Sequence, residues 1–185
     1  MSYDLQNSIY EKIHPALAYA ARETIIRTNC LGLPFEVFEG LRTPERSHFL
    51  YMQGRKLENG VWVLIDPVSL AGVVTFADAW ESWHNYGLAV DIVLNGSPAP
   101  KLQPSWDKAK DMNKDGINDW MTLGVIGMGQ GLAWGGSRKA DGSPVFGKID
   151  LPHFQITRGF AIKEAKHIVD AYGLPHLWEL IDKAA

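Results

Sequence analysis

The sequence predicts an α+β fold in a single domain, and three observations carry that prediction. Apolar residues recur at three- and four-residue spacing near both ends of the chain, which is typical of amphipathic helices. Between them lie short apolar or alternating segments bounded by Gly, Pro and Asn, which are typical of strands. The two kinds of segment do not alternate regularly, so a parallel βαβ arrangement is not expected. A chain of 185 residues without repeats or a Pro/Ser-rich linker fits one domain over residues 1–185.

The first part of the chain predicts a helix, a strand and a short second helix. The first helix contains Pro15, which suits a first turn, and ends near Gly32, a residue type that stops helices. Alternating apolar and acidic residues over 35–41 predict a strand. Thr43, followed by a proline, is typical of a helix N-cap. The buried face of the first helix is expected to hold Leu17, Ala20, Ala21, Thr24 and Ile25.

The rest of the chain mixes strands and helices. Residues 61–79 are rich in strand-forming residues interrupted by turns, and residues 87–96 predict a central strand. Residues 119–132 predict a helix that its glycines weaken. A short strand is expected within 149–157. An amphipathic helix over 160–173, followed by one or two helical turns, closes the chain.

Composition excludes several classes of function. Hydrophobic residues make up 46% and charged residues 21% of the chain, as in an ordinary globular protein. The net charge is −3 and no basic stripe is present, so no nucleic-acid partner is expected. No apolar run is long enough for membrane insertion. A single cysteine, Cys30, rules out an internal disulfide and fits a reducing cytoplasm, and the N-terminal residues lack the pattern of a secretory signal.

Two segments place polar residues in apolar surroundings. "SWHNYGLAVDI" contains His84 and Asp91, and "IDLPHFQ" contains Asp150 and His153. Burying an acid in a strand is costly unless a partner compensates it. Two histidines and a carboxylate, with a fourth position open, form a ligand set typical of catalytic zinc, and a nearby carboxylate can accept a proton from water that the metal activates. From spacing alone, a buried His–Asp pair that satisfies itself remains the alternative.

The same segments resemble the LAS-type zinc peptidases, the VanY-like peptidase family M15. "SWHNYGLAVDI" matches the family signature Ser-x-His-x-x-Gly-x-Ala-x-Asp, and "DLPHFQ" matches the second signature, acid-x-x-His. "FEGLRTPERSHFLYMQGR" resembles the upstream arginine segment, and "GLAWGG" resembles a motif of the phage L-alanyl-D-glutamate endopeptidase branch. The resemblance runs from Ser8 to Ala171. It implies a small antiparallel sheet flanked by helices, as in the Hedgehog and DD-peptidase fold.

The resemblance also implies roles for individual residues. The zinc ligands would be His84, Asp91 and His153, with Asp150 as the general base. The guanidinium of Arg42 would steady the substrate carbonyl or the developing oxyanion. The residues expected beside the metal or along the substrate groove are Ser82, Trp83 and Trp134. The chain departs from the family pattern at Ser47-His48, where relatives more often carry a glutamine; His48 is a conceivable ligand, but a surface histidine on a helix is the preferred interpretation.

The expected function is that of an endolysin, a zinc-dependent peptidoglycan hydrolase that cuts the L-Ala–D-Glu bond of the stem peptide and lyses bacterial cells. The alternatives are a zinc D-Ala-D-Ala carboxypeptidase and a non-catalytic, metal-dependent binding module. The protein is expected to be a monomer of phage or bacterial origin without a separate cell-wall-binding domain. Without a signal peptide, it would wait in the host cytoplasm until a holin opens the membrane.

A second possible metal site is the segment "DMNKDGINDW", whose spacing follows the first half of an EF-hand calcium loop. The twelfth position is Thr122 rather than a bidentate Glu, so calcium would bind weakly or need another carboxylate. The alternative is a solvated turn that caps the next helix. If calcium binds, lytic activity would depend on it. The candidate ligands are Asp111, Asn113, Asp115, the Ile117 carbonyl and Asp119.

Overall fold

The computed structural model describes residues 8–96 and 102–184. The chain divides into two compact units. The first unit contains Met1–Leu41 and Gly87–Arg158, and the second contains Arg42–Tyr86 and Gly159–Ala185. Helices and antiparallel sheets occur together, so the α+β class is confirmed. The expectation of one domain stays a prediction.

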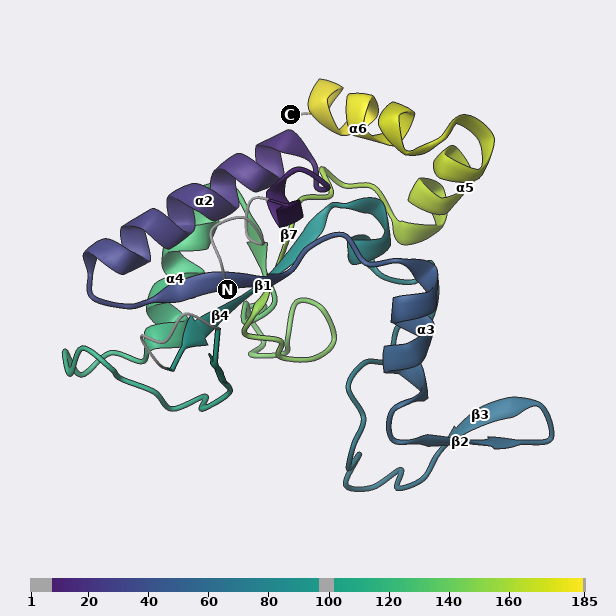
Figure 1. The fold of residues 1–185 in the computed structure, drawn as a ribbon, viewed down its shortest axis with the longest axis horizontal. Helices are drawn as coiled ribbons and strands as arrows, with labels where there is room; N and C mark the ends of the chain where they lie inside the picture. The colour runs from purple at the N-terminus through teal and green to yellow at the C-terminus, as the bar shows by residue number, and fades with distance from the viewer. Residues whose placement is uncertain (1–7, 97–101, 185) are drawn as a thin grey trace. The chain divides into compact units, whose positions relative to one another are not determined.

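The first unit is built on a five-stranded antiparallel sheet (Figure 1). The central strand is β4, which the sequence predicts correctly, and all its residues except Asp91 are buried. The strand order is β1-β4-β7-β6, and β5 also pairs with β4. The strands are β1 (Phe35–Glu39), β4 (Ala89–Asn95), β5 (Pro104–Ser105), β6 (Ala133–Trp134) and β7 (His153–Gln155).

Helix α2 (Pro15–Cys30) packs on α4 and β1 in this unit. The imidazole of His14 caps its first turn by accepting from the Ala16 N–H at 3.2 Å. Gly32 follows the C-cap at φ +76°, a conformation that glycine adopts without strain. The predicted apolar face is confirmed, since the buried residues are Leu17, Ala20, Ala21, Thr24, Ile25 and Thr28.

Helix α4 (Asp119–Gly129) is fully formed, although its glycines weaken the helical signal in the sequence. The glycines make room for aromatic rings. A Cβ on Gly124 would lie 2.4 Å from the Trp134 ring, and a Cβ on Gly127 would lie 2.4 Å from the Phe154 ring. Tertiary packing therefore overrides helix propensity here, and it brings α4 against β6 and against Phe154 of β7.

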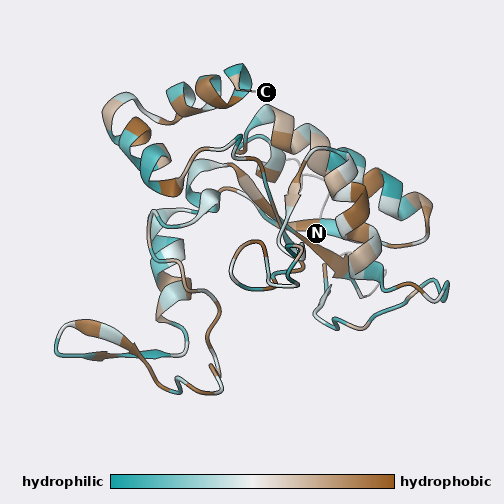
Figure 2. Cartoon of the chain, turned by 180° about the vertical axis from the view of Figure 1, so that it is seen from behind, coloured by the Kyte–Doolittle hydropathy of each residue, from teal (hydrophilic) through white to brown (hydrophobic). Residues whose placement is uncertain are grey.

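The second unit contains four helical segments and a two-stranded sheet. Thr43 caps α3 as predicted, accepting from the Arg46 N–H at 3.2 Å. The Trp178 indole in α6 donates to the Tyr86 carbonyl at 2.8 Å and so ties this helix to η1. Figure 2 shows hydrophobic residues interspersed with hydrophilic ones along α5 and α6, which pack on each other. The elements are α3 (Pro44–Met52), β2 (Arg55–Glu58), β3 (Val61–Leu64), η1 (Trp83–Tyr86), α5 (Ile162–Tyr172) and α6 (Leu174–Lys183).

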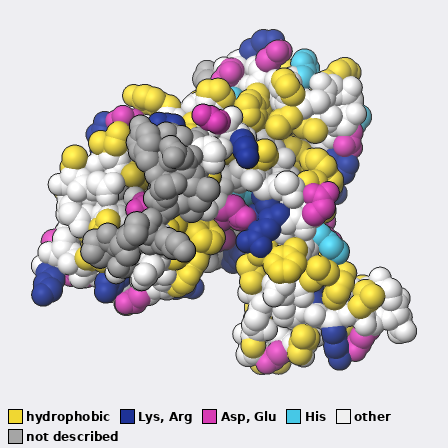
Figure 3. All heavy atoms as spheres, viewed as in Figure 1, with side chains coloured by type: hydrophobic (Ala, Val, Ile, Leu, Met, Phe, Trp, Pro, Cys, Tyr) yellow, Lys and Arg dark blue, Asp and Glu magenta, His cyan; other side chains and the backbone are white. Residues whose placement is uncertain are grey.

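The prediction of a strand-rich segment over 61–79 is wrong beyond Leu64. Asp66 closes a turn, because its Oδ1 accepts from the Val68 and Ser69 N–H groups, both at 2.9 Å. The segment that follows carries turns and bends, and its apolar residues stay exposed. Figure 3 shows hydrophobic side chains gathered over this region of the unit. The most exposed of them are Phe49, Leu57, Val61, Ile65, Val68, Val74 and Phe76.

No helix in the described part of the chain combines the length and the apolar character that crossing a membrane requires.

Replacing Gly127 by Ala should destabilise the protein by about 1–3 kcal/mol, because the new methyl group would overlap the Phe154 ring. Gly129→Ala is the matched control, since the same change near the end of α4 meets nothing within 4 Å. The control should be neutral or slightly stabilising. Thermal unfolding of both variants measures the difference, and equal stability would contradict the packing described above.

Candidate metal centre

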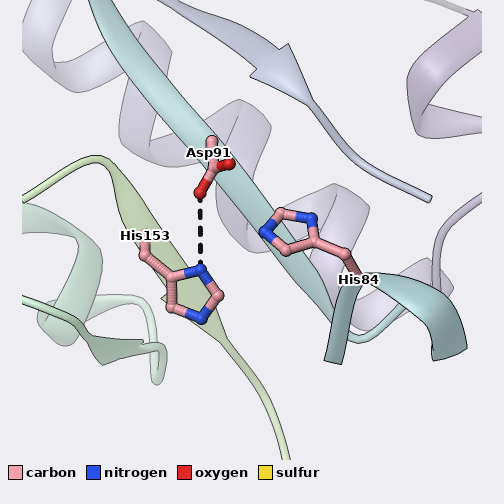
Figure 4. A group of neighbouring side chains, drawn as sticks. All are labelled: His84, Asp91 and His153. Atoms are coloured by element: carbon pink, nitrogen blue, oxygen red, sulfur yellow. Dashed lines mark ion pairs between the residues drawn. The ribbon is translucent and has the colours of Figure 1, made fainter. Parts of the chain in front are cut away.

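The two signature segments bring His84, Asp91 and His153 together (Figure 4). One ligand atom from each residue lies within 4.8 Å of the others. His84 is only 2% exposed. This is the one group of three such residues with that spacing in the described ranges 8–96 and 102–184. Two imidazoles and one carboxylate suit a transition-metal ion such as zinc, so the donor set fits a metal centre.

The Asp91–His153 pair is fixed by the sheet. Asp91 on β4 lies directly opposite His153 on β7 in the antiparallel register. Side chains in such cross-strand positions lie on the same face and contact one another. Asp91 Oδ1 is 3.4 Å from His153 Nδ1, and both side chains are largely shielded from solvent. The strand thus keeps an acid in an apolar segment because the neighbouring strand supplies its partner.

The other ring nitrogen of His153 also has a partner. Its Nε2 lies 2.9 Å from Oε1 of Gln155, two residues further along β7 on the same face of the sheet. Histidine ligands of metals usually donate their second N–H to an oxygen, which fixes the ring orientation and the tautomer. Gln155 is not among the site residues predicted from the sequence, although the His-x-Gln spacing within a predicted strand already places the two side chains on one face.

The electrostatics of this pair matter for metal binding. Burial lowers the pKa of His153, but the hydrogen bond and charge of Asp91, with smaller contributions from Gln155 and Asp150, raise it above its ordinary value. A histidine must be neutral to bind a metal. Metal binding therefore competes with a proton at His153, and acidification weakens it.

In the second unit, a network of hydrogen bonds holds the turn that carries His84. The Ser82 hydroxyl accepts from the His84 N–H at 3.4 Å, which is a local turn contact. The Arg42 N–H donates to the His84 carbonyl at 3.0 Å. Asn85 Nδ2 donates to both the Arg42 carbonyl and the Ser47 Oγ, at 2.9 Å each. Arg42, Ser47, His84 and Asn85 are all buried, so the arginine backbone is fixed to this turn.

Asn85 and Ser47 are positioning residues that the sequence analysis did not single out as such. The Ser47 hydroxyl is buried and accepts a hydrogen bond from Asn85. His48 is not a member of the metal group. It lies on the surface of α3, with its Nδ1 2.8 Å from Asp78 Oδ1 and its ring 6.2 Å from the Trp62 ring.

Asp150 lies in the turn that precedes β7. Its carbonyl accepts from the His153 N–H at 3.2 Å, and its own N–H donates to the Gly135 carbonyl at 3.0 Å. The carboxylate is partly exposed and lies 3.6 Å from Lys148 Nζ. The negative charge of the Asp150 carboxylate helps to raise the pKa of His153. Asp150 therefore lies close to the metal group but is not one of its three members.

The "GLAWGG" segment supports this turn rather than lining a groove. A Cβ on Gly135 would lie 2.2 Å from the Asp150 carbonyl oxygen, so only glycine permits this backbone approach. Trp134 is 2% exposed, stacks on Phe154 with ring centroids 6.4 Å apart, and donates to the Leu151 carbonyl at 2.8 Å. The expected substrate contact of Trp134 is therefore corrected to a packing role. Trp83 is only partly buried.

Comparisons with known proteins agree with this geometry. A family model described as D-alanyl-D-alanine carboxypeptidase, of the peptidase M15 group, matches residues 75–156, the range that contains both signature segments. The peptidoglycan L-alanyl-D-glutamate endopeptidase CwlK of Bacillus subtilis is 30% identical over 127 residues, which cover 69% of this chain and 67% of the relative. The crystal structure of the Serratia marcescens L-Ala D-Glu endopeptidase ChiX is 22% identical, covers 82% of this chain and 86% of its own, and gives a TM-score of 0.48.

Gln155→Ala should weaken metal binding by about 10–100-fold, because the His153 ring loses the acceptor that orients it. Gln155→Glu retains an acceptor at this position and should retain metal binding. Titration of the metal-stripped protein with zinc, followed by calorimetry, measures both affinities. If the Ala variant binds as tightly as the wild type, the hydrogen bond does not orient the ligand.

Proposed function

Because the chain belongs to the peptidase M15 family, we propose that it is a zinc-dependent peptidase that cuts the L-alanyl–D-glutamate bond in the peptide stem of peptidoglycan. The observation that carries the proposal is the group of His84, Asp91 and His153 in a chain related to CwlK. CwlK is named for cleavage of the L-alanyl–D-glutamate bond, and its match extends over 69% of this chain. The family model is named for the other candidate reaction, removal of the terminal D-alanine, and covers only residues 75–156.

The separation of Asp91 and His153 supports zinc as the metal. Bonds of about 2.0–2.1 Å to a tetrahedral zinc place two ligand atoms about 3.3 Å apart. The observed distance between Asp91 Oδ1 and His153 Nδ1 is 3.4 Å. His84 would supply the third ligand, which leaves a fourth position for water or substrate. A zinc ion held by these three residues would supply Lewis-acid chemistry, polarising the scissile carbonyl and making water a better nucleophile at neutral pH.

The protein residues then have separate tasks. The Asp150 carboxylate is partly exposed, so water and substrate can reach it, and it accepts the proton from the attacking water. The same carboxyl group can return that proton to the leaving amine. The Arg42 guanidinium stabilises the negative charge that develops on the carbonyl oxygen. Its backbone is held to the His84 turn, which limits the positions that the guanidinium can take.

Two narrower expectations accompany the proposal. Lysis of cells for phage release stays a prediction, because the name of the relative describes a bond specificity and its source is a bacterium. A non-catalytic binding module is disfavoured, because Asp150 and Arg42 are both retained and such a module needs neither a base nor a charge stabiliser.

Incubation with purified peptidoglycan should release fragments with new L-alanine carboxyl ends and D-glutamate amino ends. Mass spectrometry identifies these ends directly. A zinc chelator should abolish the products, and added zinc should restore them, because the water needs the metal for activation. Free D-alanine instead of the new ends would show that the protein is a carboxypeptidase. No metal-dependent product would favour the binding module.

Asp150→Asn should lower the rate of hydrolysis by about 10²–10⁴-fold, because an amide cannot accept the proton. Its zinc content should equal that of the wild type, whereas His153→Ala should lose both zinc and activity. Asp141→Asn is the matched control, since it removes one carboxylate from the same loop between β6 and β7. Metal analysis beside the fragment assay separates the cases, and full activity in Asp150→Asn would overturn the assignment of the base.

A further inference from the structure

The loop between β6 and β7 carries a positive charge in a chain that is acidic as a whole. Residues 135–149 contain three basic side chains, those of Arg138, Lys139 and Lys148, and one acid, Asp141, whereas the whole chain has a net charge of −3. All four side chains are on exposed residues. The loop therefore presents a local positive charge to solvent next to the turn of Asp150, and such a charge attracts anionic ligands.

Hydrogen bonds within the loop give it a defined conformation. The Val145 N–H donates to the Ser137 carbonyl at 3.0 Å, and Arg138 and Pro144 form an antiparallel β-bridge. The Arg138 guanidinium donates to the Gly142 carbonyl at 2.8 Å, so this cation holds the loop together. A loop fixed in this way presents its other side chains with little entropic cost when a ligand binds.

The end of the loop that leads into β7 lies against the metal group. The Phe146 ring contacts the His153 ring edge-on, with centroids 6.4 Å apart and planes at 84°. Phe146 is nevertheless 37% exposed, so part of its ring faces solvent beside a candidate metal ligand. Lys148, two residues further on, places its Nζ 3.6 Å from Asp150 Oδ2. A cation is thus held next to the proposed general base.

Stability alone does not explain the pair of Lys148 and Asp150. Their side chains are 46% and 40% exposed, and ion pairs that exposed contribute little to folding. Their separation of 3.6 Å also exceeds the 2.7–2.9 Å or so of a strong charge-assisted hydrogen bond. The ammonium group of a lysine has three N–H donors. Lys148 can therefore stay beside Asp150 and donate to a second carboxylate that the substrate brings.

The bond proposed for cleavage has such a carboxyl group beside it. The leaving amine is the nitrogen of D-glutamate, and a single carbon separates this nitrogen from the α-carboxyl group. The peptide stem continues through the side-chain carboxyl of D-glutamate, so the α-carboxyl group is a free carboxylate or, in amidated walls, a neutral amide. Asp150 must come within hydrogen-bond reach of the leaving nitrogen to return its proton. The α-carboxyl group then comes close to the partner of Asp150, which is Lys148.

We propose that Lys148 binds the α-carboxylate of D-glutamate and makes the enzyme selective for stems in which this group is not amidated. The inference rests on the proposed cleavage of the L-alanyl–D-glutamate bond. An amidated stem offers Lys148 only a neutral carbonyl oxygen, so the charge-assisted hydrogen bond is lost. Lys148 is thus a specificity-determining residue, in addition to the proposed catalytic pair of Asp150 and Arg42.

Two synthetic stems test the selectivity. One is N-acetyl-L-Ala–γ-D-Glu extended by a third residue, and the other is its α-amide with the same third residue. The zinc-loaded full chain should cleave the acid with a kcat/KM about 5–10-fold higher, since solvent partly screens a charge-assisted hydrogen bond at a half-exposed site. Equal kcat/KM values for the two stems would overturn the proposal.

Three variants make the test residue-specific. Lys148→Gln should remove the preference by slowing cleavage of the acid stem alone, and Lys148→Arg, which keeps the cation, should keep the preference. Lys139→Gln is the matched control, because it removes the same charge from an exposed position in the same loop, and it should behave as the wild type does. If Lys148→Gln slows both stems equally, the lysine serves only Asp150 and the proposal is wrong. A preference that survives in Lys148→Gln would also overturn it.

A binding measurement separates this inference from the proposed function. The dipeptide γ-D-glutamyl-L-lysine contains no L-alanyl–D-glutamate bond, so its binding does not depend on cleavage. Calorimetry with the zinc-loaded protein should show tighter binding of this dipeptide than of its α-amide, and Lys148→Gln should bind both equally.

The two readouts together distinguish the possible failures. A binding preference for the acid without cleavage of either stem would refute the proposed bond specificity and support the carboxylate site. Cleavage of both stems at equal rates, with equal binding of the two dipeptides, would refute the role of Lys148 and support the bond specificity. Neither cleavage nor a binding preference would overturn both.

Discussion

The antiparallel pairing of β4 with β7 is the constraint on which the candidate metal centre depends. It places Asp91 opposite His153 and so compensates an acid inside the most buried strand of the sheet. Gln155 lies on the same face of β7 as His153, and its Oε1 contacts the His153 ring. On the other side of β7 lies β6, and Gly135, which follows β6, forms backbone hydrogen bonds with His153 and Asp150. A shift of one residue in this register would move the carboxylate to the opposite face and separate it from the histidine.

Features that depend on local sequence could be predicted. The face of α2, the Thr43 cap and the central strand follow from periodicity and from residue types whose preferences have local causes. The three metal-binding candidates could also be named, because the two motifs that contain them resemble the signature segments of a known peptidase family.

Features that depend on contacts between distant segments could not be predicted. The glycines of α4 reduce its helix propensity, and only the rings of Trp134 and Phe154 explain why they are there. Trp134 itself belongs to a recognisable motif, yet its burial follows from the packing of that helix against the sheet. The hydrogen bonds from Asn85 to Arg42 and Ser47 join segments about 40 residues apart, for which no spacing rule exists.

The close contact between Gly135 and Asp150 has a consequence for how such an enzyme can diversify. Two backbone hydrogen bonds, from Gly135 to the His153 carbonyl and from Asp150 to the Gly135 carbonyl, fasten both ends of the intervening surface loop to the sheet. Lengthening a loop whose ends are fastened costs little free energy. Evolution can therefore insert, delete or exchange residues between these two points while Asp150 and His153 remain in place.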